Sequence, residues 1–295
     1  MRNLLSANFA RLWRSRLFWF MEAGVFGWGV LAYYLLKVNT RNGYPFLNGN
    51  SYFFNEMTFI GVTTACFSGF FIGTEYSDGA MRNKLSVGHS RMKVYLANLV
   101  TILCAGFAQF AAYTLAAVTA GTMLVGDMVW NRLYRPAETV TISFLSICTS
   151  AAIAVWISMV VIDKSKAVLI NVMLSILLLA AGASALKGLM QPEMTQRIYI
   201  SSIGEYKYAY EDSFSDEEDW VIEEVPNPKY LVGMERKVYE YVSAVLPTSQ
   251  ALSCALNEDD NDFNRFSGLQ IFGTLAAVVL ISGSGILIFR KKDLK

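Results

Sequence analysis

The sequence predicts an all-α polytopic membrane protein: six transmembrane helices, an N-terminal interfacial helix and a small α+β extracellular insertion. Three observations support this class. Of the 295 residues, 54% are hydrophobic and only 17% are charged, whereas soluble domains carry about 25% charged residues. The mean hydropathy is +0.36. Apolar runs of about 20 residues, the length that crosses a bilayer, alternate with short polar joints. The composition excludes a soluble enzyme, a disordered chain and a nucleic-acid-binding protein.

Six stretches are long and apolar enough to cross a hydrocarbon core about 30 Å thick. These stretches are 17–37, 57–73, 94–124, 138–162, 167–187 and 267–289. An even number of spans places both termini on one side of the membrane. The chain then divides into an interfacial helix with five spans (1–187), an acidic extracellular segment (188–266), and the sixth span with a basic tail (267–295).

Basic residues indicate which side the termini face. Fourteen of them lie on the termini side, in the N-terminal arm, in the joints after the second and fourth spans, and in the tail: Arg2, Arg11, Arg14, Arg16, Arg82, Lys84, Arg91, Lys93, Lys164, Lys166, Arg290, Lys291, Lys292 and Lys295. The opposite short joints hold only Arg41, Arg132 and Arg135, with Lys37 at an edge. The positive-inside rule therefore predicts that both termini are cytoplasmic. The segment 188–266 holds sixteen acidic and six basic residues, but a long loop is translocated largely regardless of its charge.

Two regions outside the spans are expected to fold. In the N-terminal arm the apolar residues Leu4, Leu5, Phe9, Leu12 and Trp13 share one half of a helical wheel, which is typical of a helix in the membrane surface. The alternative is a plain extension of the first span. In the acidic segment we expect strand structure over 198–210, an acidic turn over 213–219, and helices over 233–246 and 248–256, the second capped by Thr248.

The chain lacks the common motifs of catalysis. It has no G-x-x-x-x-G-K-[ST] phosphate loop, no H-E-x-x-H, no G-x-S-x-G, and a single histidine, His89. We therefore expect no catalytic residue, no metal site and no cofactor on this chain. Polar residues within the spans are candidates for a transport pathway: Glu22, Gln109 and Asn171. For Glu22 the alternative is a side chain that snorkels to the interface or pairs with a nearby arginine.

The joint between the second and third spans carries the most distinctive pattern. It reads Gly73-Thr-Glu-Tyr-Ser-Asp-Gly-Ala-Met-Arg-Asn-Lys-Leu-Ser-Val-Gly-His-Ser-Arg91. Acidic residues lead and basic residues trail, an order that complements a helix macrodipole. The pattern predicts a cytoplasmic helix over 74–91 that another protein could push. The alternative is that Glu75 and Arg82 only solvate a loop.

This run resembles the corresponding one in ABC type-2 permeases, the membrane subunits of bacterial ABC exporters. The resemblance extends to Asn227-Pro228-x-Tyr230, to Leu246-Pro247-Thr248-x-Gln250 and to the tail 289–295. It implies that ATP and Mg are bound by separate ABC ATPase subunits and that two permease chains, in a homodimer or heterodimer, form the pathway. It also implies that 74–91 is the coupling helix, with Glu75 and Tyr76 as leading contacts. The implied ATPase-coupling residues are Glu75, Tyr76, Arg82, Asn83, Lys84 and Arg91.

We expect a permease subunit, itself not an enzyme, in the bacterial cell membrane. With its ATPase it would move an amphipathic substrate (a peptide, an antimicrobial or a lipid-like molecule) out of the cell. Its expected partners are the ATPase, a second permease chain and membrane lipids, and no nucleic acid. Two other classes stay open: a peptide-binding sensor or immunity protein without transport, and an ion-coupled secondary carrier that depends on Glu22.

Overall fold

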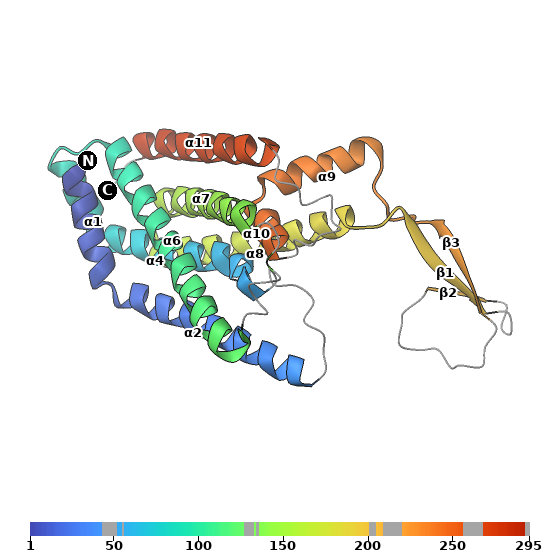
Figure 1. Cartoon of the computed structure of the whole chain (residues 1–295). Helices are drawn as coiled ribbons and strands as arrows, with labels where there is room; N and C mark the ends of the chain where they lie inside the picture. The colour runs from blue at the N-terminus through green and yellow to red at the C-terminus, as the bar shows by residue number, and fades with distance from the viewer. Residues whose placement is uncertain are drawn as a thin grey trace.

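The computed structural model describes residues 1–42, 52–54, 56–126, 133, 136–200, 205–208, 220–255 and 268–292. Among these residues, six helices are long and apolar enough to cross a membrane. They are α2 (Arg16–Arg41), α4 (Met57–Ser77), α6 (Arg91–Leu124), α7 (Pro136–Val160), α8 (Lys164–Leu189) and α11 (Gly268–Lys291) (Figure 1). The all-α polytopic class and the six expected spans are confirmed.

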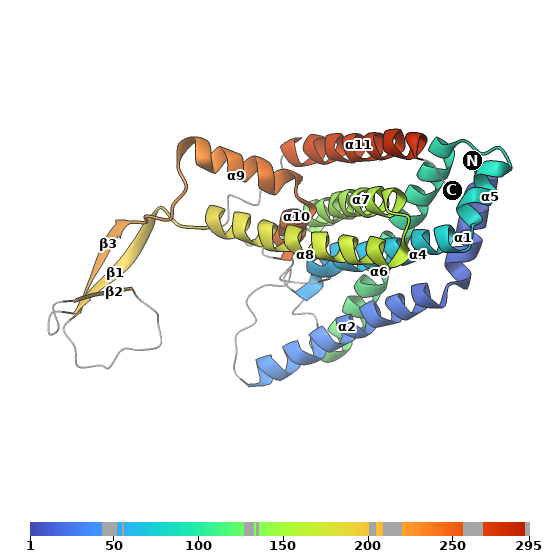
Figure 2. The same ribbon diagram turned by 180° about the vertical axis from the view of Figure 1, so that it is seen from behind.

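Shorter elements lie at the two ends of this bundle. They are α1 (Arg2–Arg14), α5 (Ala80–Ser86), α9 (Gly233–Val245), α10 (Pro247–Ala255) and the strands β1 (Met194–Ile200), β2 (Glu205–Tyr208) and β3 (Trp220–Pro226). Both chain ends lie beside α1 and α5, while the strands project from the other end (Figures 1 and 2). We call these the termini end and the sheet end.

The N-terminal arm forms a helix of its own that lies across the termini end (Figure 1). Its inward face carries Leu4, Asn8 and Leu12, all buried, at the four-residue spacing of one helix face. Ser15 adopts an extended conformation and its hydroxyl accepts a hydrogen bond from the Phe18 amide, which starts α2. Because Ser15 separates the two helices, α1 is not an extension of the first span.

The predicted helix over 74–91 has other bounds in the structure. Helix α4 runs on to Ser77, α5 has only seven residues, and Arg91 already begins α6. Two turns interrupt the helix, at Gly79 with φ +70° and at Gly88 with φ +93°. Residues with a side chain rarely adopt these dihedral angles, and a glycine at each point lets the chain reverse. The joint is therefore a short helix held between two tight turns.

Small residues set how closely the spanning helices approach. A Cβ atom added at Gly69 of α4 would lie 2.8 Å from the Cα of Val168 in α8, and one at Gly73 would lie 2.9 Å from Lys164. On the other side of the bundle, a Cβ at Gly29 of α2 would lie 2.7 Å from Ala116 of α6. These glycines thus permit backbone-to-backbone packing within the chain.

The segment 188–266 contains a three-stranded antiparallel sheet of order β2-β1-β3, in which Thr195 pairs with Val225. The strands β1 and β2 fall partly within the expected strand region 198–210, and helix α9 matches the expected helix over 233–246. The predicted acidic turn 213–219 and Leu256 lie outside the described residues. The apolar face of α9, with Val238 and Tyr241, is exposed.

Helix α10 returns into the bundle and does not stay with the sheet. The hydroxyl of Ser146 in α7 donates to the carbonyl of Pro247 at 2.6 Å, and the hydroxyl of Thr248 donates to the carbonyl of Leu178 in α8 at 2.6 Å. The predicted cap at Thr248 is therefore wrong, because its hydroxyl serves the neighbouring helix. The Leu-Pro-Thr-x-Gln motif is a contact between α10 and the spanning helices.

Candidate functional site

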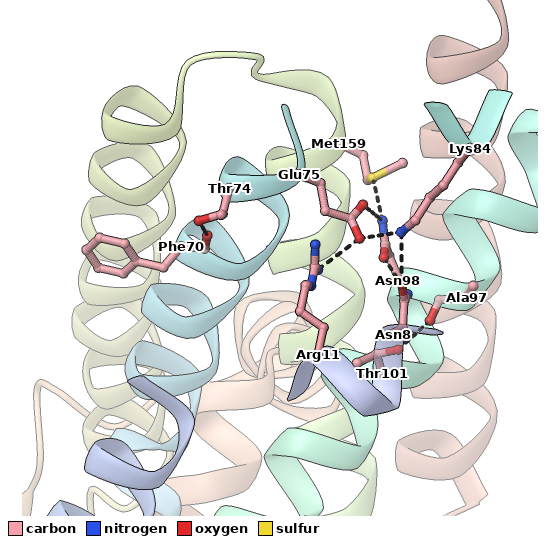
Figure 3. Close-up of polar contacts among 10 residues, drawn as sticks. All are labelled: Asn8, Arg11, Phe70, Thr74, Glu75, Lys84, Ala97, Asn98, Thr101 and Met159. Atoms are coloured by element: carbon pink, nitrogen blue, oxygen red, sulfur yellow. Dashed lines mark hydrogen bonds and ion pairs between the residues drawn. The ribbon is translucent and has the colours of Figure 1, made fainter. Parts of the chain in front are cut away.

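A buried carboxylate organises the termini end. Glu75, in the last turn of α4, has no solvent exposure. Its Oε1 forms an ion pair with Nη2 of Arg11 in α1 at 2.8 Å and a second, shorter one with Nζ of Lys84 in α5. Its Oε2 accepts a hydrogen bond from Nδ2 of Asn98 in α6 at 3.1 Å (Figure 3). One side chain thus joins four helices.

Two asparagines complete this group, which we call the Glu75 cluster (Asn8, Arg11, Glu75, Lys84 and Asn98). Nδ2 of Asn8 donates to Oδ1 of Asn98 at 2.8 Å, and Nζ of Lys84 donates to Oδ1 of Asn8 at 2.8 Å (Figure 3). Both asparagines are buried. Since every member bonds to at least one other, the buried charges are compensated as a network.

Burial and the charge of the Glu75 carboxylate act in opposite directions on the pKa values of Lys84 and Arg11, the two cations of the cluster. Burial lowers the pKa of Lys84 below its ordinary value, and the charge of Glu75 opposes that shift. The same two causes act in the same order on the pKa of Arg11. The guanidinium of Arg11 also lies 3.7 Å from the centre of the Phe71 ring, a cation–π contact. Glu75 is therefore the counter-ion that makes two partly buried cations tolerable.

A second set of contacts surrounds Tyr76, the next residue of α4. Its hydroxyl donates to the carbonyl of Met159 near the C-terminal end of α7 at 2.7 Å. Nζ of Lys292 donates to the carbonyls of Val160 at 2.7 Å and Met159 at 3.0 Å, and lies 4.7 Å from the Tyr76 ring. Burial lowers the pKa of Lys292 to about 8. A cation at the C-terminus of α7 satisfies carbonyls that the helix leaves open.

Arg91 plays the same part for α11. Its Nη1 donates to the carbonyl of Phe289 at 2.8 Å and, over a shorter distance, to that of Lys292. Arg91 is the first residue of α6, and its side chain binds carbonyl groups at the C-terminal end of α11. The last turns of α4, α7 and α11 are consequently joined at the termini end through Tyr76, Lys292 and Arg91.

The outer face of α5 remains free for a partner. Met81 is buried and Lys84 points into the Glu75 cluster, whereas Arg82, Asn83 and Ser86 are exposed. Just beyond the helix, the apolar Val87 is 78% exposed. A short helix with a buried anchor on one side and an exposed basic and apolar face on the other is a surface suited to docking.

The structure sorts the six predicted coupling residues into two groups. Arg82 and Asn83 face outward, as a docking residue must. The other four make their contacts inside the chain: Glu75, Tyr76, Lys84 and Arg91. In this conformation the Glu75 carboxylate does not reach the surface, so the expected leading contact with an ATPase does not apply to it.

Among the described residues, no hydrogen bond or ion pair joins the three predicted pathway residues to one another. Gln109 accepts a hydrogen bond from Thr63 at 3.0 Å, between α6 and α4. Asn171 of α8 donates to Ser158 of α7 at 2.8 Å. Glu22 is buried in α2, and its Oε1 has no hydrogen-bond partner among the described residues.

Several members of the site were missed in the sequence. Asn8 was detectable, because it occupies a position on the otherwise apolar face of α1 between Leu4 and Leu12. Asn98 stands among apolar residues near the start of α6 in a similar way. Lys292 binds the carbonyl of Val160, which lies 132 residues earlier in the chain. A contact at this separation cannot be predicted from the local sequence pattern.

Comparison with known proteins identifies the family. A family model described as ABC-2 family transporter protein matches residues 47–294. No curated protein matches the chain. The match covers most of the sequence, including α5 and all the spanning helices except α2. This chain therefore belongs to the ABC-2 transporter family, the membrane permease components of ABC transporters, as its resemblance over Gly73–Arg91 indicated.

Proposed function

We propose that this chain is the permease subunit of an ATP-driven exporter, and that the exposed face of α5 is where its ABC ATPase docks. Membership of the ABC-2 family supports a permease that works with an ABC ATPase in general. The observation that carries the docking site is that α5 has a buried anchor, Met81 with Lys84, whereas Arg82 on its outer face and Val87 just beyond its end are exposed.

The charge distribution supports a cytoplasmic termini end, where ATP is present. The exposed basic residues Arg82, Lys93 and Lys166 all lie at this end of the bundle. The opposite end carries the strands β1, β2 and β3 of the acidic segment. Cytoplasmic segments are enriched in arginine and lysine, so both termini and α5 are assigned to the cytoplasm.

The contacts inside the chain supply a route from α5 to the spanning helices. A push on α5 acts on Glu75 through Lys84, and Glu75 lies in the same helix as Gly69 and Gly73. Because these glycines bring α4 against the backbone of α8, the two helices move together. ATP-driven movement of the docked ATPase would thus tilt α4 and α8 and alternate the access of the pathway.

The exposed surface of the spanning helices supports an amphipathic substrate and a second permease chain. One face of α8 exposes only large apolar side chains: Leu169, Ile170, Met173, Ile176 and Leu177. Such a surface is covered by lipid or by another helix. We assign part of it to a second copy or a paralogue. The small number of charged residues within the spans supports an amphipathic substrate.

The docking face can be tested by purification in mild detergent from the native membrane. The tagged wild-type chain is expected to bring down an ATPase, identified by mass and by its phosphate-loop peptide, together with ATP hydrolysis. The variant Arg82→Ala/Val87→Asp changes only exposed side chains and is expected to lose both. Lys166→Ala, an exposed basic residue at the same end on α8, is the matched control and should keep both.

Each alternative outcome has a consequence. An ATPase that co-purifies equally with wild type and the double variant would refute α5 as the docking face. If no ATPase accompanies the wild type under any mild condition, the ATP-driven exporter itself is wrong. Transport that persists with a hydrolysis-deficient ATPase would favour the sensor or immunity class.

A further inference from the structure

A groove lies between α2 and α4. Helix α2 packs mainly on α6 and diverges from α4. The groove has a volume of about 390 Å³, within the range of roughly 300–1,000 Å³ typical of small-molecule sites. Its walls are formed mainly by apolar side chains, among them Phe20, Val25, Trp28, Phe59 and Val62.

One ionisable side chain, Glu56, lines this apolar groove at the start of α4. The residue is only 2% exposed, and its Oε1 has no hydrogen-bond partner among the described residues. A carboxyl group buried without a partner is costly in a folded protein. The groove therefore contains an acceptor that the described part of the chain leaves unsatisfied.

Glu22 of α2 supplies a second acid close to the first. It is 9% exposed, its Oε1 is likewise without a partner, and its charge acts on Glu56. Neither residue forms an ion pair with another described residue. Two acids whose charges act on each other repel when both are ionised. A cation bound beside Glu56 would reduce that repulsion and give the Glu56 carboxylate a partner.

The walls of the groove are also suited to a cation with an apolar body. The Trp28 and Phe59 rings meet edge to face, with centroids 6.1 Å apart, and remain 41% and 43% exposed. Aromatic rings attract organic cations through their negative faces. Phe20 is 78% exposed on a spanning helix, so the groove is open toward the hydrocarbon region of the membrane.

We propose that this groove binds a lipophilic cation, with its charge held by Glu56 and its apolar body against Trp28 and Phe59. The proposal rests on the proposed function and narrows its substrate class from amphipathic molecules in general to amphipathic cations. It also gives a role to Glu56, a residue that the sequence did not single out.

Direct binding tests the proposal without an ATPase or nucleotide. The full-length chain is placed in lipid nanodiscs, and binding of tritiated tetraphenylphosphonium is measured by scintillation proximity against empty nanodiscs. Wild type is expected to bind saturably. Glu56→Gln should weaken the affinity roughly ten-fold, and Glu22→Gln/Glu56→Gln further. The matched control is Glu235→Gln, an exposed acid on α9, which should bind like wild type.

The need for a positive charge on the ligand can also be measured with the wild-type chain alone. This measurement tests the proposal even if a variant does not fold. Neutral triphenylphosphine oxide should compete far more weakly than unlabelled tetraphenylphosphonium. Equal competition by the neutral compound, unchanged affinity in the double variant, or no saturable binding would each overturn the proposal. Because the assay contains no ATPase, its result is independent of the docking test. If the chain binds the cation but no ATPase co-purifies, only the proposed exporter function is contradicted. If an ATPase co-purifies but the chain does not bind the cation, only the proposed cation site in the groove is contradicted.

Discussion

The carboxylate of Glu75 lies 2.8 Å from the guanidinium of Arg11, and this ion pair ties the last turn of α4 to the N-terminal helix α1. The same carboxylate holds Lys84 of α5. A helix that lies across the end of the bundle, a spanning helix and the short connecting helix are therefore fastened at one buried point. A force applied to the outer face of α5 reaches α4 through this point without passing through a flexible joint.

Replacement of Glu75 by glutamine is expected to destabilise the fold. The change leaves Arg11 and Lys84 without their counter-ion, and removal of one partner of a buried ion pair costs roughly 3–5 kcal/mol. Because Arg11 is about a third exposed, we expect a loss of about 2–4 kcal/mol. Thermal unfolding of the purified chain in detergent measures the effect.

The double variant Glu75→Gln/Lys84→Met provides the control for this mechanism. It removes one uncompensated cation, so it should be more stable than the sum of the two single changes predicts. Strict additivity would show that Glu75 and Lys84 do not interact in the folded chain. Neither change alters the exposed residues of α5, so the variants that fold should still bring down the ATPase.

The spanning helices could be predicted from the sequence, because the thickness of the bilayer requires runs of about 20 apolar residues and such runs are visible in the sequence. The joint after the second span was only partly readable. Its motif located α5, but the two glycine turns that break the expected helix at Gly79 and Gly88 require positive φ values. Glycine permits such values without demanding them, so the sequence alone left the choice open.

The candidate site was harder to predict, because it is made by long-range contacts. The motif around Glu75 suggests a surface role, yet the residue is buried. Arg11 from 64 residues earlier pairs with it, and Asn98 from 23 residues later donates to it. Exposure depends on what packs against a residue, which spacing within one helix cannot show. Glu56 was missed for the same reason, since only the tertiary fold places it in the groove between α2 and α4.

Because α4 packs closely on α8 at Gly69, we expect that adding one methyl group at this position lowers the stability of the fold. In Gly69→Ala the new Cβ would lie 2.8 Å from the Cα of Val168, and a backbone atom cannot move aside as a flexible side chain can. We expect a loss of about 1–3 kcal/mol in the free energy of unfolding. Chemical denaturation in mixed micelles measures it.

Gly27→Ala in α2 serves as the matched control, because nothing lies within 4 Å of its added Cβ. This change should be neutral or raise stability by up to about 1 kcal/mol, since alanine favours a helix over glycine. Similar losses in the two variants would mean that α4 and α8 do not pack at Gly69 as the structure has them.

We expect the hydrogen bonds of Gln250 to stabilise the packing of α10 in the bundle. Its Nε2 donates to the carbonyl of Ala244 at 2.6 Å and to the hydroxyl of Thr274 in α11 at 2.7 Å, and the residue is buried. Gln250→Leu leaves both acceptors without this donor, which costs about 1–3 kcal/mol. Gln191→Leu, at an exposed hydrogen bond near the end of α8, should change the unfolding temperature little. A comparable drop in both variants would contradict a buried role for Gln250.

The depressed pKa of Lys292 predicts a pH dependence of stability. Burial lowers this pKa to about 8 from an ordinary value of 10.5. Between these two values the unfolded chain binds a proton at Lys292 that the folded chain does not. Stability rises with pH wherever the unfolded state binds more protons. The contribution of Lys292 is therefore least favourable below pH 8 and improves as the pH rises toward 10.

Comparison with Lys292→Met isolates this contribution from other titrating groups. The unfolding temperature of wild type minus that of the variant is measured at several pH values from 7 to 10 in detergent. We expect this difference to increase with pH above about 8. Lys166→Met, at an exposed lysine of the same end, should give a difference that does not vary. A wild-type advantage that falls as the pH rises would mean that the folded chain holds the Lys292 ammonium more tightly than water does. The contacts with the Met159 and Val160 carbonyls would then outweigh its burial.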